Sequence, residues 1–413
     1  MMINKNFRLL FSAFLISSVG DWLFRLALPL LIYKMTGSAL DMAIAYAMTF
    51  LPFVLVTPFG GVIADRWERR KILIYADFCA FVCTLLLGIL AFFTHNLYIF
   101  CFLIFLISAF TSLAHPAFQS IIPQLVPKGE LAKANSLMSV VDNLLLLIGP
   151  LAGGLTIAIL GSLNAIFLNA ASFILSSTLV FFIKILNDIY DESEGKYITF
   201  KTIFKDLTEG FNYVWNHNPT IKYGCLLFVF ANFGLQLFYA NFIFFLANFF
   251  HLNPNQIGLT LALSGVGAVT GALIAPMVGK YYNAGRLIVI CCLLEGLMVL
   301  TLLGAANEYY IALSWGIASA FGSITIVTYF TLRQQVVPSN YLGRSIAITR
   351  LISYSAIPVA SILGGWILQI TSHINYLILI SGVIMIINAC VGWFSPLGRP
   401  SVKNVDINKV ESY

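Results

Sequence analysis

The chain is built from long apolar segments, most of them close to the roughly 20 residues that cross a lipid bilayer. Of its 413 residues, 60% are hydrophobic and 10% are charged, whereas a soluble domain carries about 25% charged residues. So few charges cannot hydrate the surface of a globular core, but hydrocarbon can solvate these segments. Lipid leaves the backbone of an open sheet without partners, and the segments lack the alternation of barrel strands. The sequence therefore predicts an all-α membrane protein.

Twelve segments are long enough to span a membrane as helices. The first six are expected at residues 8–33, 39–63, 72–93, 97–121, 136–160 and 163–186. The second six are expected at 223–249, 256–282, 286–305, 308–332, 343–370 and 374–394. The first segment is too long for a signal peptide and contains two charged residues, which predicts a helix that is retained.

A polar stretch separates the two sets of six. It begins with four acidic residues between Asp188 and Glu194 and continues as an amphipathic helix from Phe200 to Trp215. The apolar face of that helix is expected to lie on the inner membrane surface. The predicted organisation is an N-terminal six-helix bundle (1–186), a cytoplasmic linker with the amphipathic helix (187–222), a C-terminal six-helix bundle (223–394) and a cytoplasmic tail (395–413).

The two sets are related, because short blocks of the first recur in the second. Gln124, Val126, Pro127, Leu131 and Lys133 recur as Gln335, Val337, Pro338, Leu342 and Arg344, at an offset of 211 residues. At the same offset Gly153-Gly154 recurs as Gly364-Gly365, and at an offset of 218 Pro58 and Gly61 recur as Pro276 and Gly279. Offsets near half the chain length predict a duplicated unit and two pseudo-symmetric bundles.

The basic residues predict the orientation of the helices. Of the 23 Lys and Arg residues, all but Arg25 and Lys34 fall on one face of the membrane or just inside a helix end beside it. Because positive loops stay in the cytoplasm, that face is expected to be cytoplasmic and to hold both termini. The net charge of +6 is then a topology signal, and no nucleic-acid partner is expected. The seven cysteines lie in apolar runs and the five histidines are scattered, so no metal site and no cofactor is expected.

The connection between the second and third segments carries a compact set of charges. It reads Gly61-Val62-Ile63-Ala64-Asp65-Arg66-Trp67-Glu68-Arg69-Arg70-Lys71. Gly61 allows close helix packing, and Asp65 can accept from amides at a helix N-terminus or pair with Arg69. The alternative is a plain positive anchor at the membrane surface, which is what we expect of Arg70 and Lys71.

This run closely resembles the loop signature of the major facilitator superfamily and departs from it only at Glu68, where many members carry Gly. The resemblance implies a gating motif of Gly61, Asp65, Arg66, Arg69 and Arg70 that stabilises the outward-facing state. In the second half of the chain Asn283 stands where Asp65 would be, so the latch is expected to be asymmetric.

The segment 136–160 contains Gly149-Pro150-Leu151-Ala152-Gly153-Gly154. Pro150 is expected to bend the helix, and the glycines permit tight helix contact, so a kinked packing helix is one adequate explanation. The run also resembles the Gly-Pro-x-x-Gly-Gly core of the antiporter motif of drug exporters, through Gly149, Pro150, Gly153 and Gly154. The match is partial, because Val140 stands where the full motif has another Gly.

From about residue 1 to 395 the chain is similar to the branch of the superfamily that contains macrolide-efflux proteins and the enterobactin exporter. The similarity lies in Thr36-Gly37-Ser38-Ala39, Asp77 after the loop motif, Pro123-Gln124-Leu125-Val126-Pro127 and Ala134-Asn135-Ser136. It implies the major facilitator fold and export of drugs or siderophores driven by an ion gradient, usually of protons. It also implies the cytoplasmic (inner) membrane of a bacterium as the location.

Five charged residues are expected inside the membrane: Asp21, Arg25, Asp142, Glu295 and Arg350. An unpaired charge there costs about 3 kcal/mol or more. Asp21 and Arg25 lie four residues apart and can pair, either as a structural pair or as a switch in which protonation of Asp21 frees Arg25. Asp77 lies six residues past Lys71, about 9 Å at helical rise, so it can reach the membrane interface.

Glu295 is the counterpart of Asp77 at the offset of 218, and no basic residue follows it within a helical turn. Such a carboxyl group can carry a proton, but a structural partner such as Arg286 or Arg333 is the favoured explanation. Asp142 and Arg350 are expected in the cytoplasmic half of their helices, as gate or cavity residues.

Mixed aromatic and amide side chains suit an amphipathic ligand. The candidates for a substrate cavity are Trp22, Phe24, Asn232, Gln236, Tyr239 and Tyr329, with Asn241 beside them. Each of them could serve helix packing instead.

The leading hypothesis is a proton-coupled exporter of an amphipathic small molecule, acting as a monomer in the lipid bilayer by alternating access. An importer of a nutrient or siderophore on the same fold is the first alternative, and a non-transporting membrane receptor is the second. An enzyme is not expected, because the sequence has no P-loop, no H-E-x-x-H and no nucleophile elbow.

Overall fold

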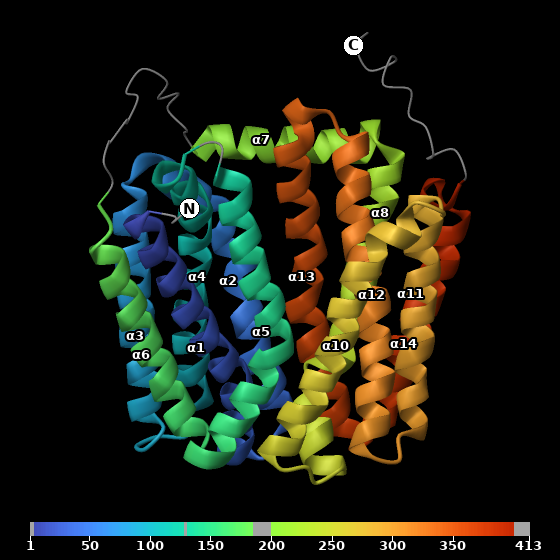
Figure 1. The fold of residues 1–413 in the computed structure, drawn as a ribbon. Coiled ribbons are helices and arrows are strands. Elements are labelled where there is room, and N and C mark those ends of the chain that lie inside the picture. Colours follow the sequence, from blue (N-terminus) through green and yellow to red (C-terminus); the bar gives the residue numbers. More distant parts are fainter. Residues whose placement is uncertain (1–3, 128–129, 185–199, 400–413) are drawn as a thin grey trace. The chain divides into compact units, whose positions relative to one another are not determined.

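The computed structural model describes residues 4–127, 130–184 and 200–399, which are almost entirely helical and contain no strand (Figure 1). Within these ranges, eleven helices are long and apolar enough to cross a membrane. A further helix, α5 (Leu131–Leu160), has 30 residues, about 45 Å at helical rise, and makes twelve. The predicted all-α membrane architecture is confirmed.

The chain divides into two compact units. Unit 1 comprises Met1–Ile203 and Leu246–Ala262, and unit 2 comprises Phe204–Phe245 and Leu263–Tyr413. The first half of the chain forms α1 (Lys5–Thr36), α2 (Ala39–Arg66), α3 (Arg69–Leu90), α4 (Leu97–Leu125), α5 and α6 (Ser162–Phe181). The second half forms α7 (Phe200–Asn212), the π-helical turn η3 (Tyr213–His217), α8 (Pro219–Tyr239), α9 (Phe242–Phe244), the π-helical turn η4 (Phe245–Phe249), α10 (Pro254–Gly279), α11 (Ala284–Thr301), the short η5 (Leu302–Gly304), α12 (Glu308–Val336), α13 (Ser339–Thr371), α14 (Ile374–Phe394) and η6 (Pro396–Gly398).

Local sequence signals explain where the first helix begins and ends. The Asn4 side chain accepts a hydrogen bond from the amide of Phe7 at 2.9 Å, which satisfies one free N–H of the first turn. Gly37 ends the helix with φ 65°, a left-handed conformation that glycine adopts without a steric penalty. The helix is therefore several residues longer than the apolar run by which the sequence predicts it.

The predicted span 223–249 is not one continuous helix. It breaks after Tyr239, and Asn241 sits fully buried at the break before the chain resumes in α9 and η4. Phe238, Phe242 and Phe245 pack against one another there with ring centroids 5.4 to 6.2 Å apart. The apolar pattern could not predict this interruption, because the residues at the break are themselves apolar or aromatic apart from Asn241.

The two units repeat one packing pattern. In unit 1, α1 packs on α5 and α6, and α3 packs on α4 and α6. In unit 2, α8 packs on α13 and α14, and α11 packs on α12 and α14. Each of these helices of the second set thus has the neighbours of its counterpart in the first, as a duplicated six-helix bundle requires.

The amphipathic helix α7 is attached to unit 2. Its Glu209 accepts a hydrogen bond from the Arg344 guanidinium near the start of α13 at 2.5 Å. The ring of Tyr213 stacks on that of Tyr341 with centroids 4.7 Å apart. These contacts join the segment between the two halves to α13.

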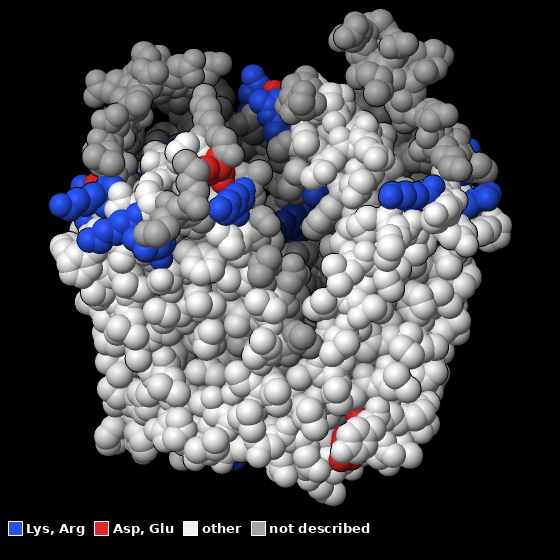
Figure 2. Space-filling model, in the orientation of Figure 1, with Lys and Arg blue, Asp and Glu red and all other residues white. Residues whose placement is uncertain are grey.

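Charged side chains are concentrated at the helix ends. Figure 2 shows most of the visible Lys and Arg side chains of each unit at one end of its helices, with a wide uncharged band beyond them. This distribution matches a bilayer-spanning protein whose charges stay outside hydrocarbon.

Glycines allow a close helix crossing in unit 2. Gly267 of α10 lies directly against the backbone of Gly316 in α12, and one turn later Gly271 lies against Ala320. A side chain at Gly267 would collide with the Gly316 carbonyl, which is backbone and cannot rotate away. Small residues at this spacing allow two helices to approach closely.

We predict that Gly267→Ala lowers the thermal unfolding midpoint in detergent, because overpacking a tight contact costs about 1–3 kcal/mol. The matched control is Gly279→Ala in the same helix, where an added methyl group meets nothing within 4 Å. Equal midpoints for the two variants would contradict the assigned role of this crossing.

Candidate functional site

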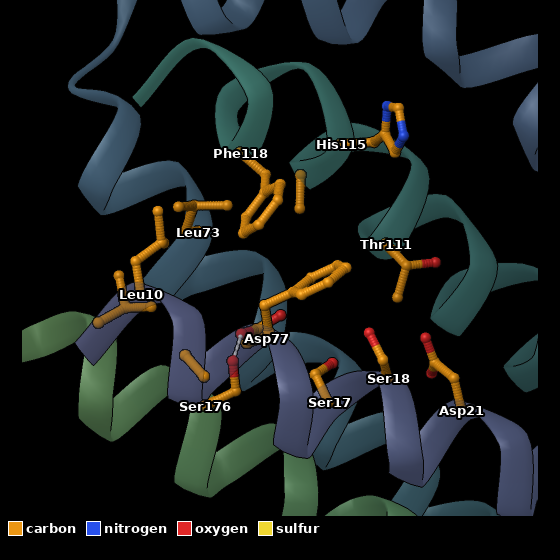
Figure 3. Close-up of a pocket in the computed structure, with 14 residues that line it drawn as sticks. Leu10, Ser17, Ser18, Asp21, Leu73, Asp77, Thr111, His115, Phe118 and Ser176 are labelled. Carbon is orange, nitrogen blue, oxygen red and sulfur yellow. Dashed lines mark hydrogen bonds between the residues drawn. The ribbon is translucent and has the colours of Figure 1, made fainter. Parts of the chain in front are cut away.

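Four helices of unit 1 surround a small pocket of about 150 Å³, which has a mainly apolar lining with several polar groups (Figure 3). It is lined by residues of α1, α3, α4 and α6. Its polar groups are two carboxyl groups, an imidazole and four hydroxyls, contributed by Asp21, Asp77, His115, Ser17, Ser18, Thr111 and Ser176. Drug-sized ligands need about 300 Å³ or more, so this pocket suits water and a small ion or proton better than a substrate.

Asp77 lies within this pocket, on α3. The hydroxyl of Ser176 on α6 donates a hydrogen bond to its carboxylate at 2.6 Å. The sequence predicts that Asp77 can reach the membrane interface, whereas in the structure its carboxylate lies between α3 and α6. Helix α3 packs along α6, and the Ser176 hydroxyl is the hydrogen-bond donor for Asp77 there.

Asp21 projects into the same pocket from α1, beside Ser17 and Ser18 (Figure 3). The pair with Arg25 expected from the spacing does not form among the described residues. Arg25 is exposed instead, with its guanidinium carbon 5.1 Å from the ring centroid of Trp22. The charge of Arg25 still acts on Asp21 at longer range.

The two carboxyl groups share one low-dielectric environment. The negative charge of Asp21 acts on Asp77, and neither residue has an ion-pair partner among the described residues. Two carboxylates that act on one another repel, and a proton on one of them relieves that repulsion. Chemically, the pocket can take up and release a proton.

The first residues of α3 contact the ends of two other helices of unit 1. Arg69 donates to the carbonyl of Ser120 in α4 at 2.9 Å. Arg70 donates to the last carbonyls of α6, at Val180 (3.4 Å) and Phe181 (2.5 Å). Arg70 is therefore more than the plain anchor predicted from the sequence, because its fork of donors satisfies a helix C-terminus.

Glu68, which departs from the family signature, forms ion pairs with Lys71 at 2.7 Å and with Arg70 at 4.0 Å. The side chains of Gly61, Asp65 and Arg66 lie outside the described residues, although helix α2 runs through all three. The gating role of the motif stays a prediction.

The glycines of the antiporter-like motif are contact points. A methyl group at Gly149 would come 2.6 Å from the Trp22 ring, and one at Gly153 would come 2.6 Å from Leu26, so both glycines let α5 approach α1. A methyl group at Gly154 would come 2.7 Å from the backbone at Gly258. The side chains of Pro150 and Asp142 lie outside the described residues.

Glu295, on α11 of unit 2, is 7% exposed and has no cationic partner among the described residues. The expected partner Arg286 instead donates to the carbonyl of Gly398 at 3.2 Å. The other expected partner, Arg333, donates to Thr349 at 2.9 Å. Glu295 packs on α12, where a methyl group at Gly322 would come 2.7 Å from its carboxyl oxygen. The expectation of an ion pair with either arginine is thus wrong.

The remaining cavity candidates occupy different settings. Asn232 donates to the carbonyl of Ser353 at 3.1 Å, and Tyr239 stacks on Trp315 with centroids 5.4 Å apart. Phe24 and Gln236 are buried. Tyr329 is buried and stacked on Phe228, and Arg350 is exposed with its guanidinium over the ring of Tyr354. Their role in substrate binding stays a prediction.

Sequence reasoning found Asp21 but missed most of the pocket around it. Ser17, Ser18, Thr111, His115 and Ser176 are ordinary polar residues in apolar runs, and nothing in their spacing connects three different helices. The signal that could have found the pocket is the repeated occurrence of a polar residue within the apolar runs of α1, α4 and α6.

Comparison with known proteins gives consistent matches over the whole chain. The family model described as "Transmembrane secretion effector" matches residues 2–412. The MFS-type transporter YfiS of Bacillus subtilis (strain 168) is 27% identical over 405 residues, covering 96% of this chain and 94% of the relative. Macrolide efflux protein A of Streptococcus pyogenes is 24% identical, covering 91% and 92%. The multidrug efflux pump Tap of Mycolicibacterium fortuitum is 24% identical, covering 86% and 87%.

Solved structures match at the level of the fold. A mutant of the nucleoside transporter NupG has a TM-score of 0.76 at 11% identity, covering 94% of this chain and 99% of its own. A D-xylose-proton symporter has a TM-score of 0.69 at 15% identity, covering 96% and 97%.

We predict that Arg70→Ala lowers the free energy of unfolding by about 1–3 kcal/mol, because charge-assisted hydrogen bonds to the end of α6 are lost. Thermal unfolding in detergent, followed by tryptophan fluorescence, measures the change. Lys71→Ala is the matched control, since its side chain is 62% exposed and an exposed ion pair contributes at most about 1 kcal/mol. A larger effect of Lys71→Ala would show that the α6 contacts are not what stabilises this end.

Proposed function

Because the chain belongs to the transmembrane secretion effector family of major facilitator transporters, we propose that it is a secondary active transporter. It exports an amphipathic small molecule, of the drug, macrolide or siderophore kind, by proton-coupled alternating access. The observation that carries the coupling step is the pocket of unit 1, which Asp21 and Asp77 both line and where neither forms an ion pair among the described residues.

The pocket supports a proton as the coupling ion. Its volume admits several water molecules, so a proton can reach either carboxyl group without a bulky ligand. Its walls come from four helices of one unit, and a charge change there alters how those helices pack. The hydroxyl of Ser176 holds Asp77 in a fixed direction, which suits a group that exchanges one proton per cycle.

Two observations support export as the direction. Relatives that match along nearly the whole chain are named as a macrolide efflux protein and a multidrug efflux pump. The antiporter-like glycines also form tight contacts, with Gly149 and Gly153 against α1. The fold itself is neutral on direction, because a D-xylose-proton symporter shares it.

The positive ends of the helices support a cytoplasmic location for both termini, in a bacterial inner membrane. The protein is proposed to act as a monomer, since each unit buries its own core.

We predict that in proteoliposomes with an imposed pH gradient, the wild type moves a macrolide probe, erythromycin, against its concentration gradient. Asp77→Asn and Asp21→Asn should each reduce gradient-driven movement about tenfold or more, because an amide cannot exchange the proton. Asp41→Asn, in the first turn of α2, is the matched control and should leave it unchanged. Gradient-driven movement that survives in the Asp21→Asn, Asp77→Asn double variant would overturn the coupling role of the pocket.

The direction is tested in cells with and without the protein. Loss of an exporter should raise the intracellular level of at least one amphipathic compound and increase drug sensitivity, as read by untargeted metabolite comparison and growth assays. The location of the C-terminus is tested separately. A green fluorescent protein fused there should fluoresce if the C-terminus is cytoplasmic, because that protein matures in the cytoplasm. Reduced uptake of a nutrient in cells lacking the protein would identify an importer instead.

A further inference from the structure

Unit 2 contains a buried cation that no carboxylate neutralises among the residues that the structure describes. Arg333, in the last turn of α12, is 6% exposed and forms no ion pair with any of them. The charged or ionisable groups that act on it are Tyr329, Cys225 and a second cation, Arg350. A guanidinium keeps its charge at every physiological pH, so it cannot become neutral as a buried carboxyl group can.

Part of the hydrogen-bonding capacity of Arg333 is unused among the described residues. One terminal nitrogen donates to the hydroxyl of Thr349 in α13 at 2.9 Å. Its Nε–H is buried and has no partner among the described residues. The rings of Tyr329 and Phe330 lie 5.6 Å and 5.0 Å from the guanidinium carbon, and such contacts stabilise a cation but satisfy no N–H donor.

Two further polar groups of α12 and α13 are also buried without partners in the described part of the chain. The phenol of Tyr329, one turn earlier on α12, is 2% exposed and has no hydrogen-bond partner there. The hydroxyl of Ser345 on α13 is fully buried and likewise has none. Ser345 and Thr349 lie four residues apart on one face of α13, and Thr349 is the residue that contacts Arg333. A buried donor without a partner calls for an explanation, and a bound water or ion is one that fits several such donors in one place.

A purely structural role fits these contacts poorly. An arginine that caps its own helix directs its donors at the last backbone carbonyls, whereas the side-chain hydrogen bond of Arg333 goes to a hydroxyl of another helix. An arginine that braces two helices in a low-dielectric interior is normally paired with a carboxylate. Besides the ionisable groups Tyr329 and Cys225, the charged side chain that acts on Arg333 is that of a second cation, Arg350, which is exposed.

We propose that Arg333, with Tyr329 and Ser345, forms a binding site for an oxyanion, the carboxylate or phosphate group of an amphipathic ligand, and that Thr349 holds the guanidinium in place. Arginine presents its donors in a planar fork that matches both groups. The rings of Tyr329 and Phe330 supply apolar surface beside the charge, and Arg350 extends the positive field to the surface of the unit. The site can belong to the transport cycle, and in that case the transported molecule is an acidic amphiphile. That part of the assignment rests on the proposed function.

The test uses the full chain in nanodiscs of phosphatidylcholine, with benzoate and phenyl phosphate as probes and benzylamine as the cationic counterpart. Benzoate and phenyl phosphate should bind by calorimetry and raise the thermal midpoint, and benzylamine should do neither. Arg333→Gln should weaken anion binding about tenfold or more, since a charge-assisted pair is lost. Arg333→Lys should lose less, because the charge remains, and Tyr329→Phe should lose a part through its hydroxyl.

Arg286→Gln is the matched control, because Arg286 also lies in unit 2 but donates to the Gly398 carbonyl and lies over Trp393. It should bind the anions as the wild type does. Without anion, Arg333→Gln should unfold at the same or a higher temperature, because it removes an uncompensated buried charge. A lower midpoint together with unchanged anion binding would show a structural brace and overturn the proposal, as would a wild type that binds neither anion.

Two further arms separate the possible sources of the oxyanion. If a phospholipid occupies the site, phosphatidylglycerol in the nanodisc should suppress benzoate binding, and native mass spectrometry should show it retained by the wild type and lost from Arg333→Gln. If a soluble acid occupies it, phosphatidylglycerol should leave benzoate binding unchanged. Either result supports the site. The binding assay contains no ion gradient, so a failure of proton-coupled transport leaves its outcome unaffected, and the reverse also holds.

Discussion

The cost of placing a charge in hydrocarbon governs where the ionisable side chains of this protein lie. The apolar helices can cross a membrane because most charged residues lie at their ends, as the clustered Lys and Arg side chains show. Four ionisable side chains that lie within the units face protein rather than lipid. Asp21 and Asp77 share a pocket with several hydroxyl groups, Glu295 packs on a glycine, and Arg333 lies between α12 and α13.

The same constraint explains the glycines. Without a hydrophobic driving force between helices in lipid, helix association depends on close packing. Gly267 against Gly316, and Gly149 and Gly153 against α1, provide that packing in the two units. The contacts are rigid, so a change in charge or hydration inside a unit is transmitted as a shift of whole helices rather than absorbed by side chains.

Much of the fold could be predicted from the sequence, because the length and spacing of apolar segments depend only on local composition. The twelve spans and the repeated packing pattern follow from signals that each segment carries itself. The break at Asn241 and the capping of α6 by Arg70 could not be predicted, since both depend on what lies across the bundle.

The candidate sites were harder to predict from the sequence than the fold, for the same reason. The i, i+4 spacing of Asp21 and Arg25 made a pair plausible, yet the side chain of Asp21 lines the pocket and that of Arg25 lies over Trp22. Arg333 entered the sequence argument only as a partner for Glu295. Its significance depends on the absence of a carboxylate around it among the described residues, which no single-sequence pattern can reveal.

The two proposed sites divide the work of a coupled transporter between the two units. The proton pocket is formed by α1, α3, α4 and α6, and the oxyanion site by α12 and α13, so no described residue belongs to both. A proton and an anion bound at separate places cannot compete directly for one group. Their exchange can then be linked only through the conformation that each binding event favours, and the linkage must be reciprocal. For an exporter, the favourable arrangement is that neutralising the carboxyl pair and neutralising Arg333 stabilise opposite states, because proton entry then drives release of the anion.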